Sequence, residues 1–284
     1  MVRFSILKLW LITSATLAAL AVVVVLGFLL HASWPLLQAQ GLGFVTEPEW
    51  YPYEDIYGLA PALLGSFWVV SVALLMAVPL ALSAAIMSAE LLSPRMRSGV
   101  RFSMELMAGI PSVVYGLLGL WLLLPFLESQ LDLLTGRTLL AAGMLLALMV
   151  MPTIMVLAED AISGVSIEQR ETSLQLGLDW PTLLYRVILP QAWPGIRVAI
   201  LLALGRVMGE TVAVMLVVGS LDRLPEPFYN LLLPAQTLTS RIGREMAEAD
   251  MGSLHWAALM SGGLVLALVA IAVSLMAQRS VRHA

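Results

Sequence analysis

The stretch PGIRVAILLALGRVMGETVAVMLVVGS, residues 194–220, is a mostly apolar run that decides how the whole chain is interpreted. It is long enough to cross a bilayer as a helix, which requires roughly 20 apolar residues. Arg206 and Glu210 stand near its middle, one helical turn apart. A central arginine alone costs roughly 2.5–3.5 kcal/mol on insertion scales. We therefore expect both charges to serve the handling of a charged solute within a membrane.

The composition of the chain supports the same class. Of its 284 residues, 60% are hydrophobic and 12% are charged, whereas soluble domains average about 45–50% apolar and about 25% charged residues. An all-α, polytopic membrane protein is predicted. A net charge of −4 without a basic cluster argues against a nucleic-acid partner, and the lack of cysteine excludes disulfides and cysteine-bound metals.

Hydropathy predicts six membrane spans, with both termini on the same side. The predicted spans are residues 9–30, 60–87, 102–127, 138–159, 194–220 and 254–278. The first span is longer than the roughly 7–15-residue core of a cleaved signal peptide, so we expect it to be retained.

The distribution of charge orients the spans. Basic residues gather in the connections on one side: Arg3, Lys8, Arg95, Arg97, Arg101, Arg170, Arg186, Arg197, Arg279 and Arg282. The first loop of the other side, residues 31–59, has acidic residues but no lysine or arginine. By the positive-inside rule, both termini and the 160–193 segment face the cytoplasm, and the 31–59, 128–137 and 221–253 segments are external.

The third span contains the sequence GIPSVVYG, residues 109–116. Pro111 removes a backbone donor and bends a helix, while Gly109 and Gly116 permit unwinding or close packing. Broken helices inside membranes require protein or water around the freed backbone groups. A gating element facing the interior of the bundle and an ordinary proline kink are both compatible with this pattern.

Several other charged residues receive simpler interpretations. In the external 221–253 segment we expect a short helix from Leu238 to Ala249. Arg241 and Arg244 are expected on its solvated face, in preference to a role in receiving an anion. Glu105 is expected in a surface ion pair with Arg101. Glu159 and Asp160 are expected to be solvated at the cytoplasmic end of the fourth span.

The sequence carries no recognisable catalytic machinery. Lys8 is the only lysine, so no phosphate-binding loop of the P-loop ATPases can be present. His31, His255 and His283 are far apart in sequence and are expected at interfaces or in solvent rather than as metal ligands. We therefore predict neither an enzyme nor a metal site on this chain.

The cytoplasmic segment has a specific pattern. Residues 166–187 are amphipathic and interrupted by Gly177 and Pro181, which predicts two short helices outside the bilayer. Glu171-Thr172-Ser173 is followed by three residues, Gly177, nine residues and then Val187-Ile188-Leu189-Pro190. This spacing resembles the EAA loop of ABC importer permeases, with Thr172, Ser173 and Val187 as departures. The resemblance implies docking of an ATP-binding subunit by Glu171, Thr172, Ser173, Gly177, Leu189 and Pro190.

A narrower resemblance covers most of the chain from about residue 58. The 109–116 and 205–214 sequences, Thr237-Leu-Thr and Gly252-Ser-Leu-His255 are similar to PstC-type permease subunits of phosphate importers; Ser220 stands where asparagine is expected. The resemblance implies a type I importer permease fold in the cytoplasmic (inner) membrane. It divides the chain into an N-terminal helix and loop (1–58), a permease core (59–278) and a cytoplasmic tail (279–284).

The partners follow from the same resemblance. They are a PstA-type second permease, two ATP-binding subunits that hold ATP and Mg, and an extracytoplasmic phosphate-binding protein. This chain itself is expected to bind no cofactor and to be surrounded by membrane lipid.

A physical model of the site can be built on a continuous fifth helix. The 4-3-4-3-4 spacing places the following residues on one stripe: Ala199, Ala203, Arg206, Glu210, Ala213 and Val217. In this model Arg206 binds phosphate through its planar fork, and Glu210 neutralises Arg206 when the path is empty. Glu210 also selects phosphate, which carries a proton at neutral pH, over sulfate. Gly205 and Gly209 permit close approach of another helix.

Three alternatives remain. Arg206 and Glu210 can form a purely structural ion pair. Another oxyanion (sulfate, molybdate or phosphonate) can be the solute. An ion-coupled secondary transporter can use the two charges as a proton relay, although such a protein has no need of an ATPase-docking segment.

Overall fold

The computed structural model describes the backbone of residues 2–282 and the side chains of residues 8–275. His283 lies outside the described residues. Within the described part, six helices are long and apolar enough to cross a membrane, as predicted. They are Lys8–Gln40, Ala60–Glu90, Ser112–Leu131, Leu139–Ser163, Trp180–Gly209 and Leu254–Leu275.

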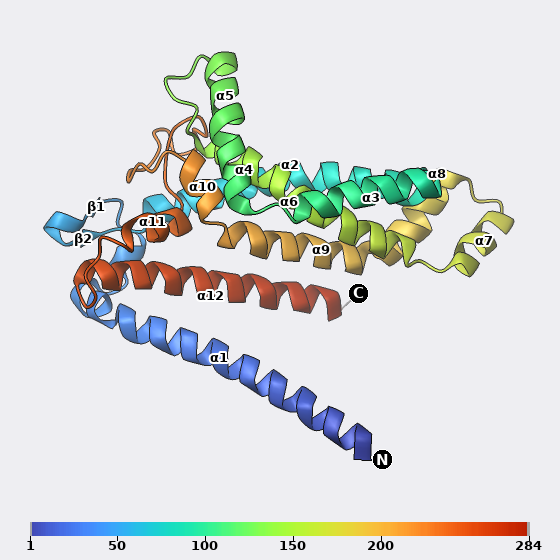
Figure 1. Cartoon of the computed structure of the whole chain (residues 1–284), viewed down its shortest axis with the longest axis horizontal. Helices are drawn as coiled ribbons and strands as arrows, with labels where there is room; N and C mark the ends of the chain where they lie inside the picture. The colour runs from blue at the N-terminus through green and yellow to red at the C-terminus, as the bar shows by residue number, and fades with distance from the viewer. Residues whose placement is uncertain (1, 283–284) are drawn as a thin grey trace.

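Short turns and breaks divide these spans into the labelled elements of Figure 1. The helices are α1 (Val2–Gln40), α2 (Ala60–Glu90), α3 (Pro94–Ala108), α4 (Ser112–Leu118), α5 (Leu124–Leu131), α6 (Leu139–Ser163), α7 (Ile167–Gln175), α8 (Trp180–Leu183), α9 (Leu189–Gly209), α10 (Val212–Val217), α11 (Leu238–Glu245) and α12 (Leu254–Arg282). Two π-helical turns, η3 (Gly119–Leu123) and η4 (Leu184–Ile188), join α4 to α5 and α8 to α9. The first loop contains the 3-10 turns η1 (Gly43–Val45) and η2 (Pro52–Glu54) and an antiparallel pair, β1 (Trp50–Tyr51) and β2 (Ile56–Tyr57).

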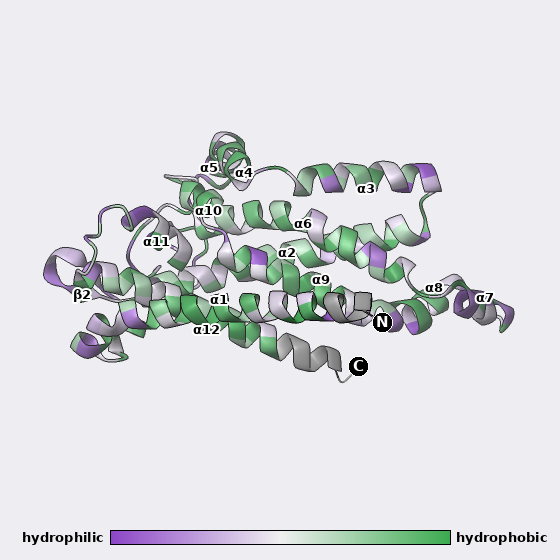
Figure 2. Ribbon diagram, turned by 60° about the horizontal axis from the view of Figure 1, so that its bottom comes forward, coloured by the Kyte–Doolittle hydropathy of each residue, from purple (hydrophilic) through white to green (hydrophobic). Residues whose placement is uncertain are grey.

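Polar residues gather at the two ends of the bundle. Figure 2 shows hydrophilic residues around α7 at one end and around β2 and α11 at the other, with mostly apolar helices between them. The two chain ends lie toward the α7 end in Figure 1, and the β hairpin lies at the opposite end. This arrangement agrees with six spans and with the orientation expected from the basic residues.

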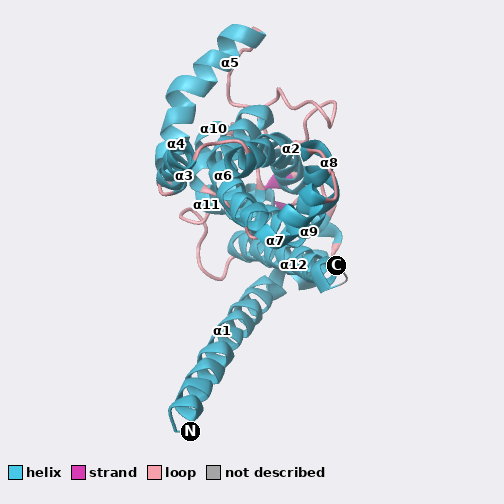
Figure 3. Ribbon diagram, turned by 90° about the vertical axis from the view of Figure 1, so that its right-hand side faces the viewer, coloured by secondary structure: helices cyan, strands magenta, loops and turns pink. Residues whose placement is uncertain are grey.

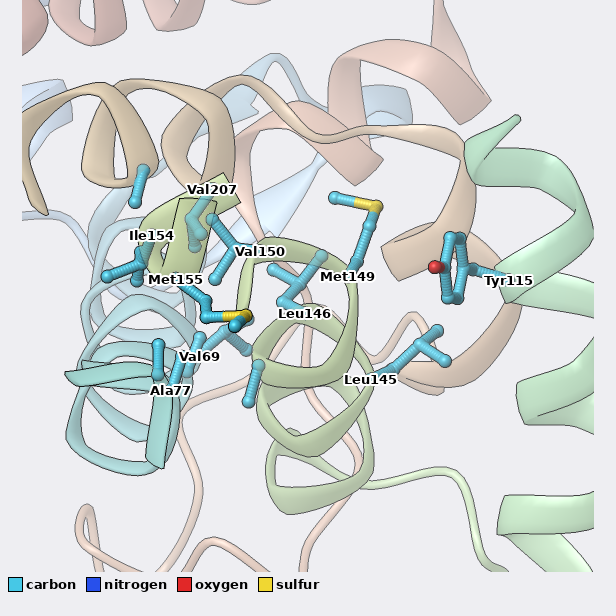
Figure 4. Packing of buried hydrophobic residues seen from close by; sticks show 14 of the residues in the cluster. Val69, Ala77, Tyr115, Leu145, Leu146, Met149, Val150, Ile154, Met155 and Val207 are labelled. Carbon is cyan, nitrogen blue, oxygen red and sulfur yellow. The ribbon is translucent and has the colours of Figure 1, made fainter. Parts of the chain in front are cut away.

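The core is organised around α6. Small residues at four-residue spacing (Ala73, Ala77, Ala81 and Ala85) form a buried row on α2, which lets α2 pack closely against α6. At Gly143 of α6 an added Cβ would lie 2.5 Å from the Val72 side chain, so only glycine fits this crossing. Figure 4 shows α6 side chains that point toward α2, toward Tyr115 of α4 and toward Val207 of α9.

Helix α1 stands apart from this core. Its hydrophobic span has no buried residue in its most apolar window, and α1 packs against α12. The contact lies toward the C-terminal end of α1, where Phe28 meets Trp256 with ring centroids 6.3 Å apart. Figure 3 shows α1 leaning away from the other helices. Its apolar surface therefore faces the surrounding membrane or another protein.

The third span begins later than predicted. Residues 102–127 are predicted as one span in which a broken helix and a proline kink at 109–116 are both possible. Helix α3 ends at Ala108 and α4 begins at Ser112, so the chain breaks rather than kinks. Gly109 caps α3, and Pro111, which has no N–H to donate, precedes α4. Gly116 permits the close contact of α4 with α10, because an added Cβ would lie 2.6 Å from the Leu216 side chain.

The cytoplasmic end of α6 also differs from the expectation. Glu159 is fully buried and forms an ion pair with Arg97 of α3, so its predicted solvation is wrong. Asp160 is half-exposed and pairs with Arg101. The predicted surface pair between Arg101 and Glu105 is confirmed, with Nε and Oε1 2.9 Å apart.

Candidate functional site

Arg206 lies in the last turn of α9 and faces α6. Its Nη1 donates a hydrogen bond of 3.1 Å to Oγ1 of Thr153, and its side chain is partly buried. A guanidinium has five donor positions, so the single bond to Thr153 leaves most of them available to another partner. Arg206 is thus held in place from α6 while keeping the capacity to bind an anion.

The fifth span is not one helix. Helix α9 ends at Gly209, Glu210 has an extended backbone with φ −72° and ψ 126°, and α10 begins at Val212. The predicted continuous stripe is therefore wrong. The break has a local cause: Gly209 ends a helix readily, and the Glu210 Oε1 accepts a 3.2 Å bond from the Ala213 N–H at the start of α10. A glycine followed by Glu-Thr was the sequence signal for this break.

The external segment satisfies the backbone exposed by the break. The Thr239 Oγ1 on α11 donates a 2.8 Å hydrogen bond to the Glu210 carbonyl. Gly243 of α11 packs on Thr211, since an added Cβ would lie 2.7 Å from Thr211 Cγ2. Irregular backbone at membrane depth is tolerated where protein covers it, and α11 provides that cover.

Arg206 and Glu210 do not form the predicted pair. Among the described side chains, no ion pair joins them; Glu210 instead borders a mainly apolar cavity of about 300 Å³ between α2, α9 and α12, whose lining does not include Arg206. The expectation that Glu210 neutralises Arg206 is therefore wrong.

The small residues of the predicted stripe are also not on an open path. Ala199, Ala203, Ala213 and Val217 are all fully buried within the chain. Gly205 and Gly209 are exposed, and a Cβ at either position would meet no atom within 4 Å. Their face of α9 is therefore open.

The sequence interpretation missed a buried polar cluster at the external end. Arg241 of α11 is fully buried, so its predicted place on a solvated face is wrong. Its Nη2 lies 3.0 Å from Asp222 Oδ1, and its Nη1 donates to the Gly58 carbonyl at 2.9 Å. Arg244 is half-buried and bonds both Asp222 and Glu245 at 3.0 Å. The sequence signal for this cluster was the presence of opposite charges within one external segment, residues 221–253.

Aromatic side chains from the first external loop complete the cluster. The Trp50 ring lies over the Arg241 guanidinium at 4.3 Å, and its Nε1 donates a 3.0 Å bond to Glu245 Oε2. His255 contacts the same oxygen at 2.9 Å and stacks on Tyr57. His255 is thus partly buried and paired rather than solvated.

Burial and charge shift the pKa values of several groups in this cluster, among them Arg241 and Tyr57. Burial lowers the pKa of the Arg241 guanidinium, and Asp222 and Glu245 act in the opposite direction. Burial, together with the neighbouring Asp55, raises the pKa of Tyr57 to about 12. Both effects are consistent with a water-poor cluster that ties residues 50–57 to α11.

The cytoplasmic segment has the first of the two predicted short helices, α7. The prediction of a second separate short helix is wrong, because α8 continues through η4 into α9 as one helix, Trp180–Gly209. Helix α7 is followed by a turn in which Gly177 has a φ of +83°, a conformation that favours glycine, and then by α8. Glu171, Thr172 and Gly177 are exposed. Ser173 is buried and bonds the Gln169 carbonyl at 2.7 Å.

The start of α9 completes the residues expected to dock an ATP-binding subunit. Pro190 is exposed there and Leu189 is partly buried. Most of the expected docking residues are thus on the surface at one end of the bundle. Among the described residues, no group of three or more histidine, aspartate or glutamate side chains is arranged to hold a metal ion.

Comparison with known proteins adds independent findings. The family described as "Binding-protein-dependent transport system inner membrane component" matches residues 77–283. The phosphate transport system permease protein PstC of Mesorhizobium japonicum is 32% identical over 275 residues, covering 89% of this chain and 83% of the relative. The probable ABC transporter permease protein YqgH of Bacillus subtilis is 34% identical over 252 residues, covering 88% and 80%.

Solved structures support the fold. A bacterial ABC transporter involved in the import of the acidic polysaccharide alginate is 16% identical, with a TM-score of 0.60 and 96% of both chains covered. The MetNI methionine ABC transporter is 18% identical, with a TM-score of 0.57, covering 80% of this chain and 94% of the other. At these identities the likeness concerns the fold alone.

Proposed function

Since this chain belongs to the family of inner membrane components of binding-protein-dependent transport systems, we propose that it is the permease subunit of an ATP-driven importer of inorganic phosphate. The observation that carries the proposal is its similarity to PstC phosphate permeases along nearly the whole chain. An arginine held at a helix break within a membrane span supports the handling of an anion. ATP and Mg are bound by a separate subunit in this proposal.

Arg206 is the proposed anion contact. The bond that Nη1 donates to Thr153 fixes one nitrogen of the guanidinium, and the remaining donors can bind two oxygens of one phosphate in a forked geometry. A charge-assisted contact of this kind suits a site that binds the ion and then releases it as the protein changes conformation. The rest of the site is contributed by a PstA-type second permease.

The surfaces that bind the partner subunits are proposed from the exposure of their residues. The exposed Gly205 and Gly209 on α9 leave room for a closely packed helix of the second permease. The exposed residues of α7 and the start of α9 dock one of two ATP-binding subunits. The external end receives a phosphate-binding protein.

The direct test is transport by the purified complex in liposomes. With ATP inside and the binding protein outside, labelled phosphate is expected to accumulate, and excess unlabelled phosphate is expected to compete more strongly than sulfate, molybdate or phosphonate. ATP-dependent accumulation of one of the other oxyanions, without phosphate uptake, would contradict the proposed solute. Uptake without ATP would contradict the proposed energy source.

Glu210 is proposed to contribute to the choice of anion at the cavity that it borders, apart from Arg206. Its Oε1 caps α10, and a carboxylate retains further lone pairs that can accept from a protonated phosphate but repel sulfate. Glu210→Gln keeps an oxygen for the Ala213 N–H and removes the charge. We expect this variant to lower the preference for phosphate over sulfate about tenfold. An unchanged preference would leave Glu210 with the capping role only.

A further inference from the structure

Arg170 joins three elements at the cytoplasmic end of the bundle. It lies on α7, and its Nη1 is 2.6 Å from Oε1 of Glu90, the last residue of α2. Its Nη2 donates to the Ile162 carbonyl at 2.6 Å, and its Nε donates to the Val165 carbonyl at 3.2 Å. One guanidinium thus holds the ends of both α2 and α6.

The geometry of this contact favours a firm connection. The Glu90 side chain is 7% exposed and that of Arg170 is 21% exposed, so the pair is shielded from solvent. Carbonyls at a helix C-terminus lack partners within the helix and attract positive charge. At the end of α6, Arg170 provides both a hydrogen-bond donor for these carbonyls and a positive charge. The next residues of α7, Glu171 and Thr172, are exposed.

Helix α6 connects this contact with Arg206. It is continuous from Leu139 to Ser163 and is the most buried of the six spans. Thr153, which binds Arg206, precedes Ile162 by nine residues, or about 14 Å along a helix. The hydrogen bonds of Arg170 and of Arg206 are therefore both made to one continuous helix.

We propose that Arg170 is a positioning residue that couples movement of α7 to α2 and α6, and through α6 to Arg206. This inference rests on the proposed function, because α7 moves only if an ATP-binding subunit docks on it. When the docked subunit shifts α7, the ion pair and hydrogen bonds of Arg170 move the ends of α2 and α6 together with α7. Without the contacts of Arg170, ATP hydrolysis continues but drives less transport.

The test measures phosphate transported per ATP hydrolysed by the reconstituted complex. Arg170→Gln and Glu90→Gln are each expected to lower this ratio about tenfold, within the range of typical coupling between sites, while ATP hydrolysis is retained. Arg170→Lys is expected to lie between these variants and the unchanged protein, because an ammonium cannot reach all three acceptors in the same geometry.

A matched control is Arg101 of α3, which contacts the same end of α6. Arg101→Gln removes partly exposed ion pairs to Asp160 and Glu105 that do not involve α7. Exposed pairs contribute little, so the transport ratio is expected to stay within about twofold of the unchanged protein. An unchanged ratio in both Arg170→Gln and Glu90→Gln would overturn the proposal. Failure of both variants to assemble would also overturn it in favour of a purely structural role.

A cross-link separates this inference from the proposed docking. The chain has no cysteine, so Thr172→Cys places a single thiol on the exposed face of α7. Cross-linking to a cysteine-bearing ATP-binding subunit is expected. If the cross-link forms and the ratio is unchanged in Arg170→Gln, the coupling role alone fails. If no cross-link forms in the active complex, the proposed docking fails.

Discussion

Arg206→Ala is expected to lower ATP-dependent phosphate uptake by at least about 100-fold while the complex still assembles. A hydrogen bond to a charged group contributes about 1.5–3 kcal/mol, and each 1.4 kcal/mol corresponds to about tenfold in affinity. Loss of a forked contact removes two such bonds from the anion. Initial rates of labelled phosphate uptake into liposomes, normalised to the amount of assembled complex, measure the effect.

Three variants make this result interpretable. Arg206→Lys keeps the charge without the planar fork and is expected to retain part of the uptake. Thr153→Val removes the bond that orients Arg206 and is expected to have a smaller effect than Arg206→Ala. Arg95→Ala removes an exposed arginine of α3 and is expected to change nothing. Undiminished uptake by Arg206→Ala would refute the assignment of the anion contact.

Arg241→Gln is expected to destabilise the folded chain by about 3 kcal/mol, the lower end of the cost of removing one partner from a buried ion pair, because Arg241 is fully buried but Asp222 is partly exposed and keeps Arg244. The change removes one of the two arginines that pair with Asp222, and it removes the guanidinium beneath Trp50. It also loosens the attachment of the first external loop at Gly58. The measurement is the free energy of unfolding in detergent, from a denaturant titration followed by tryptophan fluorescence.

The comparison variant is Arg223→Gln in the same external segment. Arg223 is exposed, and surface substitutions usually change stability by less than about 0.5 kcal/mol. Arg244→Gln, at a half-exposed position, is expected to fall between the two. Equal stability of the Arg241 and Arg223 variants would show that the buried cluster does not stabilise the external end.

The sequence alone was sufficient for the membrane class, the number of spans and the first short helix of the docking segment, α7. These features depend on local quantities: apolar length, charge bias between loops, and the turn formed at Gly177. The spacing around Glu171 and the 205–214 sequence also identified the family, which the match over residues 77–283 supports. Each of these signals is readable without knowing which helices are neighbours.

The tertiary structure alone decided which side chains meet. Periodicity predicts Arg206 and Glu210 on one face of a single helix. The helix breaks at Gly209, so Glu210 borders a cavity that Arg206 does not line, and Arg206 is hydrogen-bonded to Thr153 instead. Arg241 was expected in solvent because a short polar helix is usually exposed. Residues far apart in the sequence, Trp50 and Asp222, enclose it instead. Burial and ion pairing depend on long-range packing, which local sequence patterns do not encode.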